Sequence, residues 1–148
     1  MQKEELDLDS KVKEAVDFHG HLGPFLVLGV RMGLIGLREV QVEKGNSKLQ
    51  ATVILEHEVP LSCTIDGIQV TTGCTIGNGR LGLKNTKNII AAEFHLKEKE
   101  HVTVTLGPTK FKELTKALPK DARSYKNIQL ARNVASSPEE ELFVIKKK

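Results

Sequence analysis

The stretch LGPFLVLGVRMGLIGL, from Leu22 to Leu37, is the longest apolar run of the chain and decides how we expect it to fold. Pro24 is tolerated in the first turn of a helix, since the N–H that proline lacks would have no intrahelical partner there. Gly29, Gly33 and Gly36 recur at helical spacing, which leaves one side of the predicted helix almost bare of side chains. Each glycine costs a helix about 1 kcal/mol relative to alanine. We therefore expect close packing on that side, by a sheet or by a second copy of the chain, rather than a set of merely tolerated glycines.

The same run does not have the length of a membrane span, which needs about 20 apolar residues. It has 16 residues and contains Arg31. The opening MQKEELDLDSK is charged and has no signal-like apolar stretch. We expect a soluble cytoplasmic protein without membrane contact, whose two cysteines are thiols, metal ligands or catalysts rather than a disulfide.

Size and charge further limit the class of protein. The 148 residues fit a single domain, residues 1–148. The net charge of +3 is mild, and much of it comes from the closing Lys146–Lys148, which we interpret as a solvated tail. With no Trp and one Tyr, few aromatic rings are available to stack on nucleobases, so we expect no nucleic-acid partner.

The remaining elements are predicted from hydrophobic periodicity and from capping and turn signals. Four expected helices run from Asp9 or Ser10 to His19, from Pro24 to about Leu37, from Thr109 to Leu118, and from Asp121 to about Ala135. A further short helix of about two turns is expected to begin at a cap on Asp66, with the Gln69 side chain reaching back to it. The expected strands are Leu49–Leu55, Asn88–Leu96 and Val102–Leu106, with a hairpin tip at Lys97–Glu100 and a short apolar segment at Leu142–Ile145. This order indicates an α+β fold, an antiparallel or mixed sheet with helices packed on it.

Four residues that bind soft or borderline metals fall at breaks between these elements: His19, His21, Cys63 and Cys74. The glycine between the histidines lets the backbone turn, so that both rings can face one point. Imidazole and thiolate together favour zinc, or another divalent transition metal, in tetrahedral geometry. Taken singly, each residue has a plainer interpretation, the histidines as polar helix ends and the cysteines as small buried hydrophobes. The spacing alone leaves both interpretations open.

Gly77, Gly79 and Gly82 have the spacing of a dinucleotide-binding fingerprint. That fingerprint needs a strand before it and a helix after it. Here a turn precedes the glycines and the next strand is expected at Asn88, which leaves no room for a helix. We therefore reject dinucleotide binding.

The other three histidines are not part of this group of candidate metal ligands. His57 lies between two glutamates, and we interpret it as a surface residue. His95 and His101 flank the predicted hairpin tip, where they could reach each other across the strands. We interpret them as a solvated pair.

Two segments together resemble the FmdE-like family, which is named for a component of formylmethanofuran dehydrogenase. They are FHGHLGPFLVLGVRMG, from Phe18 to Gly33, and CTIDGIQVTTGCTIGNGRL, from Cys63 to Leu81. The family carries an FHGH motif that opens a glycine-bearing helix, followed by a C-x-x-DGIQ-x-x-TGCT-x-G segment. Both occur here in that order, and the resemblance covers about residues 10–145.

The resemblance implies an α+β domain similar to the FwdE fold and to the catalytic domain of glyceraldehyde-3-phosphate dehydrogenase (GAPDH). It also implies a metal site, usually of zinc, whose ligands are the motif histidines and cysteines, His19, His21, Cys63 and Cys74. Asp66 and Gln69 match the DGIQ segment and are implied to shape this site.

The chain departs from the family pattern in one place that bears on chemistry. Many members have HGHxCPG, whereas this chain has Gly23 in place of the cysteine and Phe25 in place of the glycine. The missing cysteine removes one ligand or redox partner, which weakens dithiol chemistry. No cysteine follows Cys74, so we expect no C-terminal zinc-ribbon extension of the kind that some members carry.

Three functions fit these observations. The first, implied by the resemblance, is a metal-binding protein, an accessory or enzyme-like component linked to a formylmethanofuran dehydrogenase complex or to one-carbon metabolism. The second is a thiol enzyme in which Cys63 or Cys74 is a nucleophile activated by His19 or His21. The third is a non-catalytic interaction module in which HGH is a structural turn. The glycine side of the apolar helix also favours a homodimer.

Overall fold

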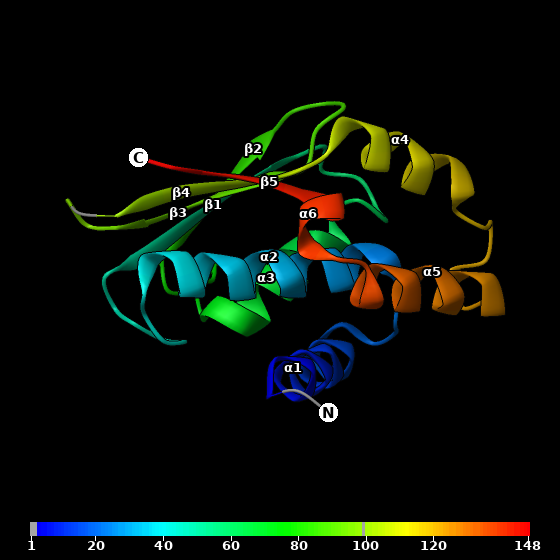
Figure 1. Ribbon diagram of the computed structural model, residues 1–148, viewed down its shortest axis with the longest axis horizontal. Coiled ribbons are helices and arrows are strands. Elements are labelled where there is room, and N and C mark those ends of the chain that lie inside the picture. Colours follow the sequence, from blue (N-terminus) through cyan, green and yellow to red (C-terminus); the bar gives the residue numbers. More distant parts are fainter. Residues whose placement is uncertain (1–2, 99) are drawn as a thin grey trace.

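The computed structural model describes residues 3–98 and 100–148, which form six helices and a five-stranded sheet (Figure 1). The helices are α1 (Lys3–His19), α2 (Pro24–Val40), α3 (Cys63–Thr72), α4 (Pro108–Ala117), α5 (Tyr125–Ser136) and α6 (Glu139–Leu142). The strands are β1 (Leu49–Leu55), β2 (Leu81–Asn85), β3 (Ala91–Leu96), β4 (His101–Leu106) and β5 (Phe143–Lys147). The predicted α+β class is confirmed, while the likeness to the FwdE and GAPDH folds stays a prediction.

The sheet is mixed, with strand order β2-β1-β3-β4-β5. β1 and β2 are parallel because the chain between them crosses through α3, and the other neighbours are antiparallel. The predicted strands correspond to β1, β3 and β4. β2 was not predicted; it overlaps Gly82 and ends before the strand expected at Asn88. Its sequence LGLKN is short and mostly exposed, so its strand geometry depends on pairing with β1 rather than on its own alternation.

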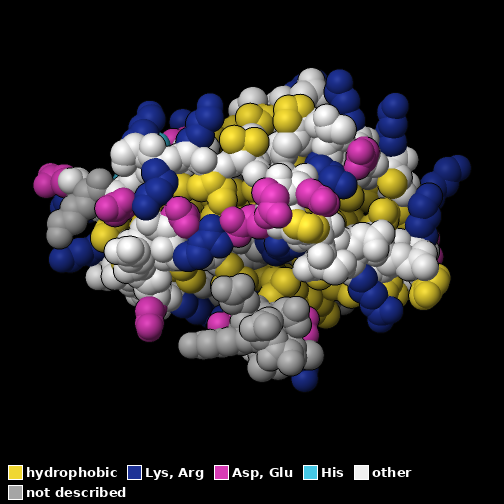
Figure 2. Space-filling view, viewed as in Figure 1, with side chains coloured by type: hydrophobic (Ala, Val, Ile, Leu, Met, Phe, Trp, Pro, Cys, Tyr) yellow, Lys and Arg dark blue, Asp and Glu magenta, His cyan; other side chains and the backbone are white. Residues whose placement is uncertain are grey.

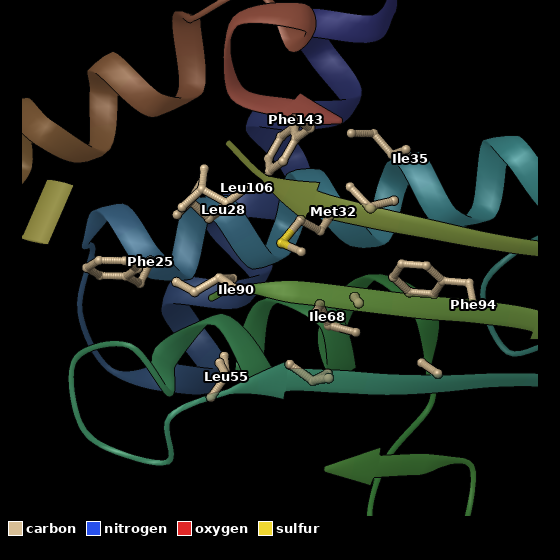
Figure 3. Close-up of a cluster of buried hydrophobic side chains, with 14 of the residues drawn as sticks. Phe25, Leu28, Met32, Ile35, Leu55, Ile68, Ile90, Phe94, Leu106 and Phe143 are labelled. Atoms are coloured by element: carbon tan, nitrogen blue, oxygen red, sulfur yellow. The ribbon is translucent and has the colours of Figure 1, made fainter. Parts of the chain in front are cut away.

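α2 packs on one face of the sheet, where it contacts β3 and β4, and it also contacts α1, α3 and α5 (Figure 1). Figure 3 shows Phe25, Leu28 and Met32 of α2 in one buried cluster with Ile90 and Phe94 at the sheet. Burying each such side chain contributes about 1.5–3 kcal/mol. Within residues 3–98 and 100–148, no helix combines the length and the apolar character that crossing a membrane would take.

The glycine side of α2 is closely packed, as predicted, but Gly29 and Gly33 meet helix α3 rather than the sheet or the second copy that was expected, while Gly36 meets the sheet. A methyl group on Gly29 would overlap the backbone carbonyl of Thr64, and one on Gly33 would overlap the Thr71 hydroxyl. One on Gly36 would lie 2.6 Å from the ring of Phe94 in β3. Gly29 and Gly33 therefore meet Thr64 and Thr71 in the same order along α3, which runs parallel to α2. This surface is not free for a second copy of the chain, so the predicted homodimer would have to form through a different surface.

Several elements begin at residues other than those predicted. α1 begins at Lys3 instead of Asp9 or Ser10. α3 begins at Cys63 with Ser62 as its N-cap, so Asp66 lies in the first turn and does not cap the helix. The helix can start early because the turn before it already supplies a carbonyl acceptor, with Cys63 N–H donating to the Pro60 carbonyl at 3.1 Å.

The later elements also differ at their ends. α5 begins at Tyr125 instead of Asp121, because the Ser124 side chain accepts a hydrogen bond from the Asn127 N–H and caps the helix there. The apolar segment near the end of the chain becomes the edge strand β5, which begins at Phe143. The predicted hairpin tip Lys97–Glu100 joins β3 to β4, and Lys99 within it lies outside the described residues.

The face of the molecule drawn in Figure 2 carries charged side chains of both signs, interspersed with apolar ones rather than sorted by sign. Arg38 of α2 makes an exposed ionic contact with α6. The Arg38 guanidinium donates to both carboxylate oxygens of Glu139, at 2.7 and 3.0 Å, and so ties α2 to α6. The same contact holds the pKa of the Glu139 carboxyl below its ordinary value.

The contact between α2 and α3 predicts a specific loss of stability. Gly29→Ala is expected to lower the free energy of unfolding by about 1–3 kcal/mol, because the Thr64 backbone cannot move aside as a flexible side chain would. The loss should appear although alanine is the better helix former by about 1 kcal/mol. Urea unfolding of both proteins measures it.

Gly77→Ala is the matched control. The nearest atom to a methyl group there is the Thr75 hydroxyl oxygen at 3.8 Å, an ordinary contact. Its effect should stay within about 0.5 kcal/mol. A Gly29→Ala protein as stable as the wild type would contradict the close approach of the two helices.

Candidate metal centre

His19 and Asp66, 47 residues apart in sequence, meet at the end of the molecule where α1 stops and α3 starts. The Nδ1 atom of His19 lies 2.6 Å from Oδ2 of Asp66. Gln69, one turn further along α3, donates from Nε2 to Oδ1 of Asp66 at 3.2 Å. A carboxylate at Nδ1 favours the imidazole tautomer that carries its proton there, and that tautomer presents a lone pair at Nε2.

The turn after α1 brings His21 beside His19. Gly20 has φ +110°, a conformation that side chains disfavour, and its N–H donates to the Val16 carbonyl at 2.7 Å and ends the helix. The predicted turn at this glycine is confirmed. The two imidazole ring centres lie 4.8 Å apart, with their planes tilted by 39°. Two imidazoles that share one zinc ion at Zn–N distances of about 2.0–2.1 Å have ring centres about 5 Å apart.

The Nε2 atom of His19 is buried and has no hydrogen-bond partner among the described residues. Leaving such an atom unpaired costs about 1–3 kcal/mol, so native structures rarely keep one without a reason. The pKa of His21 is lowered, first by its partial burial and then by the positive charges of His19 and Arg123. A neutral imidazole is the form that binds a metal ion. The lowered pKa of His21 therefore favours the form of that ring that binds a metal ion.

Cys63 is the first residue of α3 and lies one helical turn before Asp66. Only 7% of it is exposed. Burial raises the pKa of its thiol, and the negative charge of Asp66 raises it further. The group is thus a neutral thiol at neutral pH unless a cation stabilises the thiolate. Cys63 is at the same end of α3 as the His19–Asp66 pair.

Cys74 follows the opposite end of α3, and the ten residues of that helix span about 15 Å. Its side chain is fully buried, and Sγ donates to the Leu49 carbonyl at the start of β1 at 3.4 Å. Burial also raises the pKa of this thiol. In the described part of the chain, no three or more His, Cys, Asp or Glu side chains converge closely enough to hold a metal ion. The structure pairs His19 with Asp66 and, separately, with His21, and it leaves Cys74 apart.

Asn127 is a residue of this region that the sequence did not reveal. It is 5% exposed, and its Nδ2 donates to the Ala122 carbonyl at 2.7 Å and to the Leu22 carbonyl at 3.5 Å. These bonds tie the start of α5 to the loop that carries His21. The only local signal was the cap at Ser124, which marks a helix start but does not show what the helix contacts.

α5 runs parallel to α2, as α3 does. Asn127 near the start of α5 meets Leu22, which precedes α2, whereas Arg31 in α2 donates to the Val134 carbonyl near the end of α5 at 2.8 Å. Three helices therefore begin at the end of the molecule that holds the two histidines. The positive ends of helix dipoles favour negative charge nearby, such as the Asp66 carboxylate in the first turn of α3.

Comparisons with known proteins agree with the motifs. A stretch of 67 residues is 43% identical to a "Probable S-adenosyl-L-methionine-binding protein" of Archaeoglobus fulgidus. That match covers 45% of this chain and 18% of the relative, so it spans less than a fifth of the relative's length. The family model described as "FmdE, Molybdenum formylmethanofuran dehydrogenase operon" matches residues 18–144. Since this match covers most of the chain, including the HGH loop and all of α3, the chain belongs to the FmdE family.

Proposed function

We propose that this FmdE-family protein binds a divalent transition metal, zinc in the first instance, at His19 and His21, and acts in the cytoplasm as an accessory or enzyme-like partner of formylmethanofuran dehydrogenase. One observation carries the metal proposal. A buried imidazole is held through Nδ1 by Asp66, its Nε2 has no partner within residues 3–98 and 100–148, and a second imidazole lies 4.8 Å away. The link to the dehydrogenase rests on the family's description alone.

Asp66 is the positioning residue of this proposal. Imidazoles that bind metal commonly donate their other ring N–H to a carboxylate, which fixes the ring and makes the ligating nitrogen more basic. Gln69 holds the second oxygen of Asp66 and so limits the rotation of the carboxylate. Asp66 and Gln69 of the DGIQ segment therefore shape the proposed site without either residue having to contact the metal.

Cys63 is the proposed third ligand, because it begins the helix that carries Asp66 and its thiol has little access to solvent. It is not preassembled with the two imidazoles among the described residues, so the proposal requires it to move into reach when the ion binds. A cation beside it would stabilise the thiolate that burial otherwise disfavours. We leave Cys74 out of the ligand set, because its thiol is bonded to the Leu49 carbonyl beyond the far end of α3. With three protein ligands, a bound ion keeps one position for water or substrate and lowers the pKa of a coordinated water toward neutrality.

The same burial argues against a thiol enzyme. A nucleophilic cysteine needs a depressed pKa, whereas both thiols here have raised ones. A non-catalytic module would give no role to Nε2 of His19, which has no polar partner in the described residues. Metal binding accounts for both features.

The first test is the metal content of the purified protein. We expect about one zinc per chain in the wild type and a loss of nearly all of it in His19→Ala and in His21→Ala, because each substitution removes an imidazole ligand. Elemental analysis after gentle, chelator-free purification measures this. His57→Ala is the matched control, since His57 lies on an exposed loop. Full zinc content in both site variants would overturn the proposal.

The second test addresses Asp66. Asp66→Asn keeps the size of the side chain but weakens the hold on Nδ1, so metal affinity should fall by about 10–100-fold. Competition with a chromophoric chelator gives the dissociation constant, and circular dichroism checks that the fold is kept. Unchanged affinity in a folded Asp66→Asn protein would mean that Asp66 only joins α1 to α3.

The third test separates the metal site from the thiol enzyme. In metal-free Cys74→Ala protein, Cys63 is the remaining thiol, and its alkylation rate should rise only at a pH above that of an ordinary cysteine, because its pKa is raised. Rates measured over a pH series with iodoacetamide give this titration. A rise at acid-shifted pH would favour the thiol enzyme instead.

A further inference from the structure

A second group of imidazole and carboxylate side chains lies on the sheet face opposite the buried core. His95 of β3 is paired directly with His101 of β4. The neighbouring pair is hydrogen bonded, with Leu96 N–H donating to the Glu100 carbonyl at 2.9 Å, so His95 and His101 form a non-hydrogen-bonded pair. In such pairs the facing side chains of antiparallel strands come closest. The two ring centres are 6.3 Å apart, with the rings perpendicular.

Glu93 lies on the same face, two residues before His95. Its Oε2 is 3.1 Å from Nε2 of His101, and its Oε1 is 3.8 Å from Nζ of Lys84. A carboxylate at Nε2 favours the tautomer with the proton there and presents the lone pair of His101 at Nδ1. In both pairs a carboxylate holds one ring nitrogen and leaves the other free to bind. Asp66 holds Nδ1 of His19, whereas Glu93 holds Nε2 of His101.

These residues line a cleft of about 460 Å³ on the hairpin. Its walls include Glu98 and Glu100 as well as Glu93, against Lys84 as a cationic side chain. The cleft therefore brings two imidazole nitrogen donors together with three carboxylates and one ammonium group.

We propose that His95 and His101 bind a divalent transition-metal ion between them, with Glu93 holding His101 in orientation and water filling the other positions. The ring centres need to approach from 6.3 Å to about 5 Å, so the proposal requires the two partly exposed side chains to rotate when the ion binds. No third ligand is preassembled among the described side chains, so the protein supplies two imidazoles. Imidazole donors and the Irving–Williams order favour Cu²⁺ and Ni²⁺ at such a site. This second site does not depend on the first.

Titration of the untagged, metal-free protein with Ni²⁺ tests this site, followed by the ring ¹H–¹⁵N NMR signals of each histidine. We expect the His95 and His101 signals to change together and to saturate near one equivalent beyond any taken up by the His19–His21 centre. His95→Ala should abolish the response of His101, and Glu93→Gln should weaken it by about tenfold. The same responses should persist in His19→Ala/His21→Ala protein, so failure of the first centre does not mimic failure of the second.

His57 serves as the internal control, since it is exposed and lies outside the strands of the described chain. Its signal should respond only at much higher Ni²⁺ concentration. The proposal is overturned if His95 and His101 respond no earlier than His57, or if His101 responds equally well in His95→Ala protein. Either result would make these histidines an ordinary solvated pair.

Discussion

Helices α2 and α3 approach each other backbone to backbone because glycines remove the side chains that would separate them. The contact is reciprocal. A methyl group on Gly29 would overlap the Thr64 carbonyl, and one on Gly67 would lie 2.5 Å from the Val30 nitrogen. Since the helices are parallel and cannot slide past each other without clashes, the start of α3 is fixed relative to the loop before α2. That register brings Asp66 to His19.

The His19–Asp66 pair is more than a tie between two helices. A tie needs one nitrogen of the imidazole, whereas the other nitrogen of His19 is buried and has no polar partner among the described residues. The free energy that this arrangement costs, about 1–3 kcal/mol, is recovered when Nε2 binds an ion or a water molecule. The second imidazole of the HGH turn and the thiol of Cys63 lie at the same end of the fold, which gives such a ligand further donors.

Local patterns in the sequence predicted the elements that depend on local causes. Periodicity identified α2, and the glycine spacing indicated its close packing. β2 could not be predicted, because an exposed edge strand takes its geometry from β1. The predicted short helix already had Cys63 before its start and Cys74 after its end, although the cap signal at Asp66 placed that start three residues too late. The approach of Asp66 to His19 arises from helix packing, which no short motif encodes.

The tautomer and metal response of His19 test the central claim most directly, and ¹⁵N NMR of the imidazole nitrogens measures both. We predict that metal-free His19 carries its proton on Nδ1 beside Asp66, and that stoichiometric zinc shifts the Nε2 resonance while Nδ1 stays protonated. A proton on Nε2, or a His19 spectrum that zinc leaves unchanged, would contradict the proposed centre.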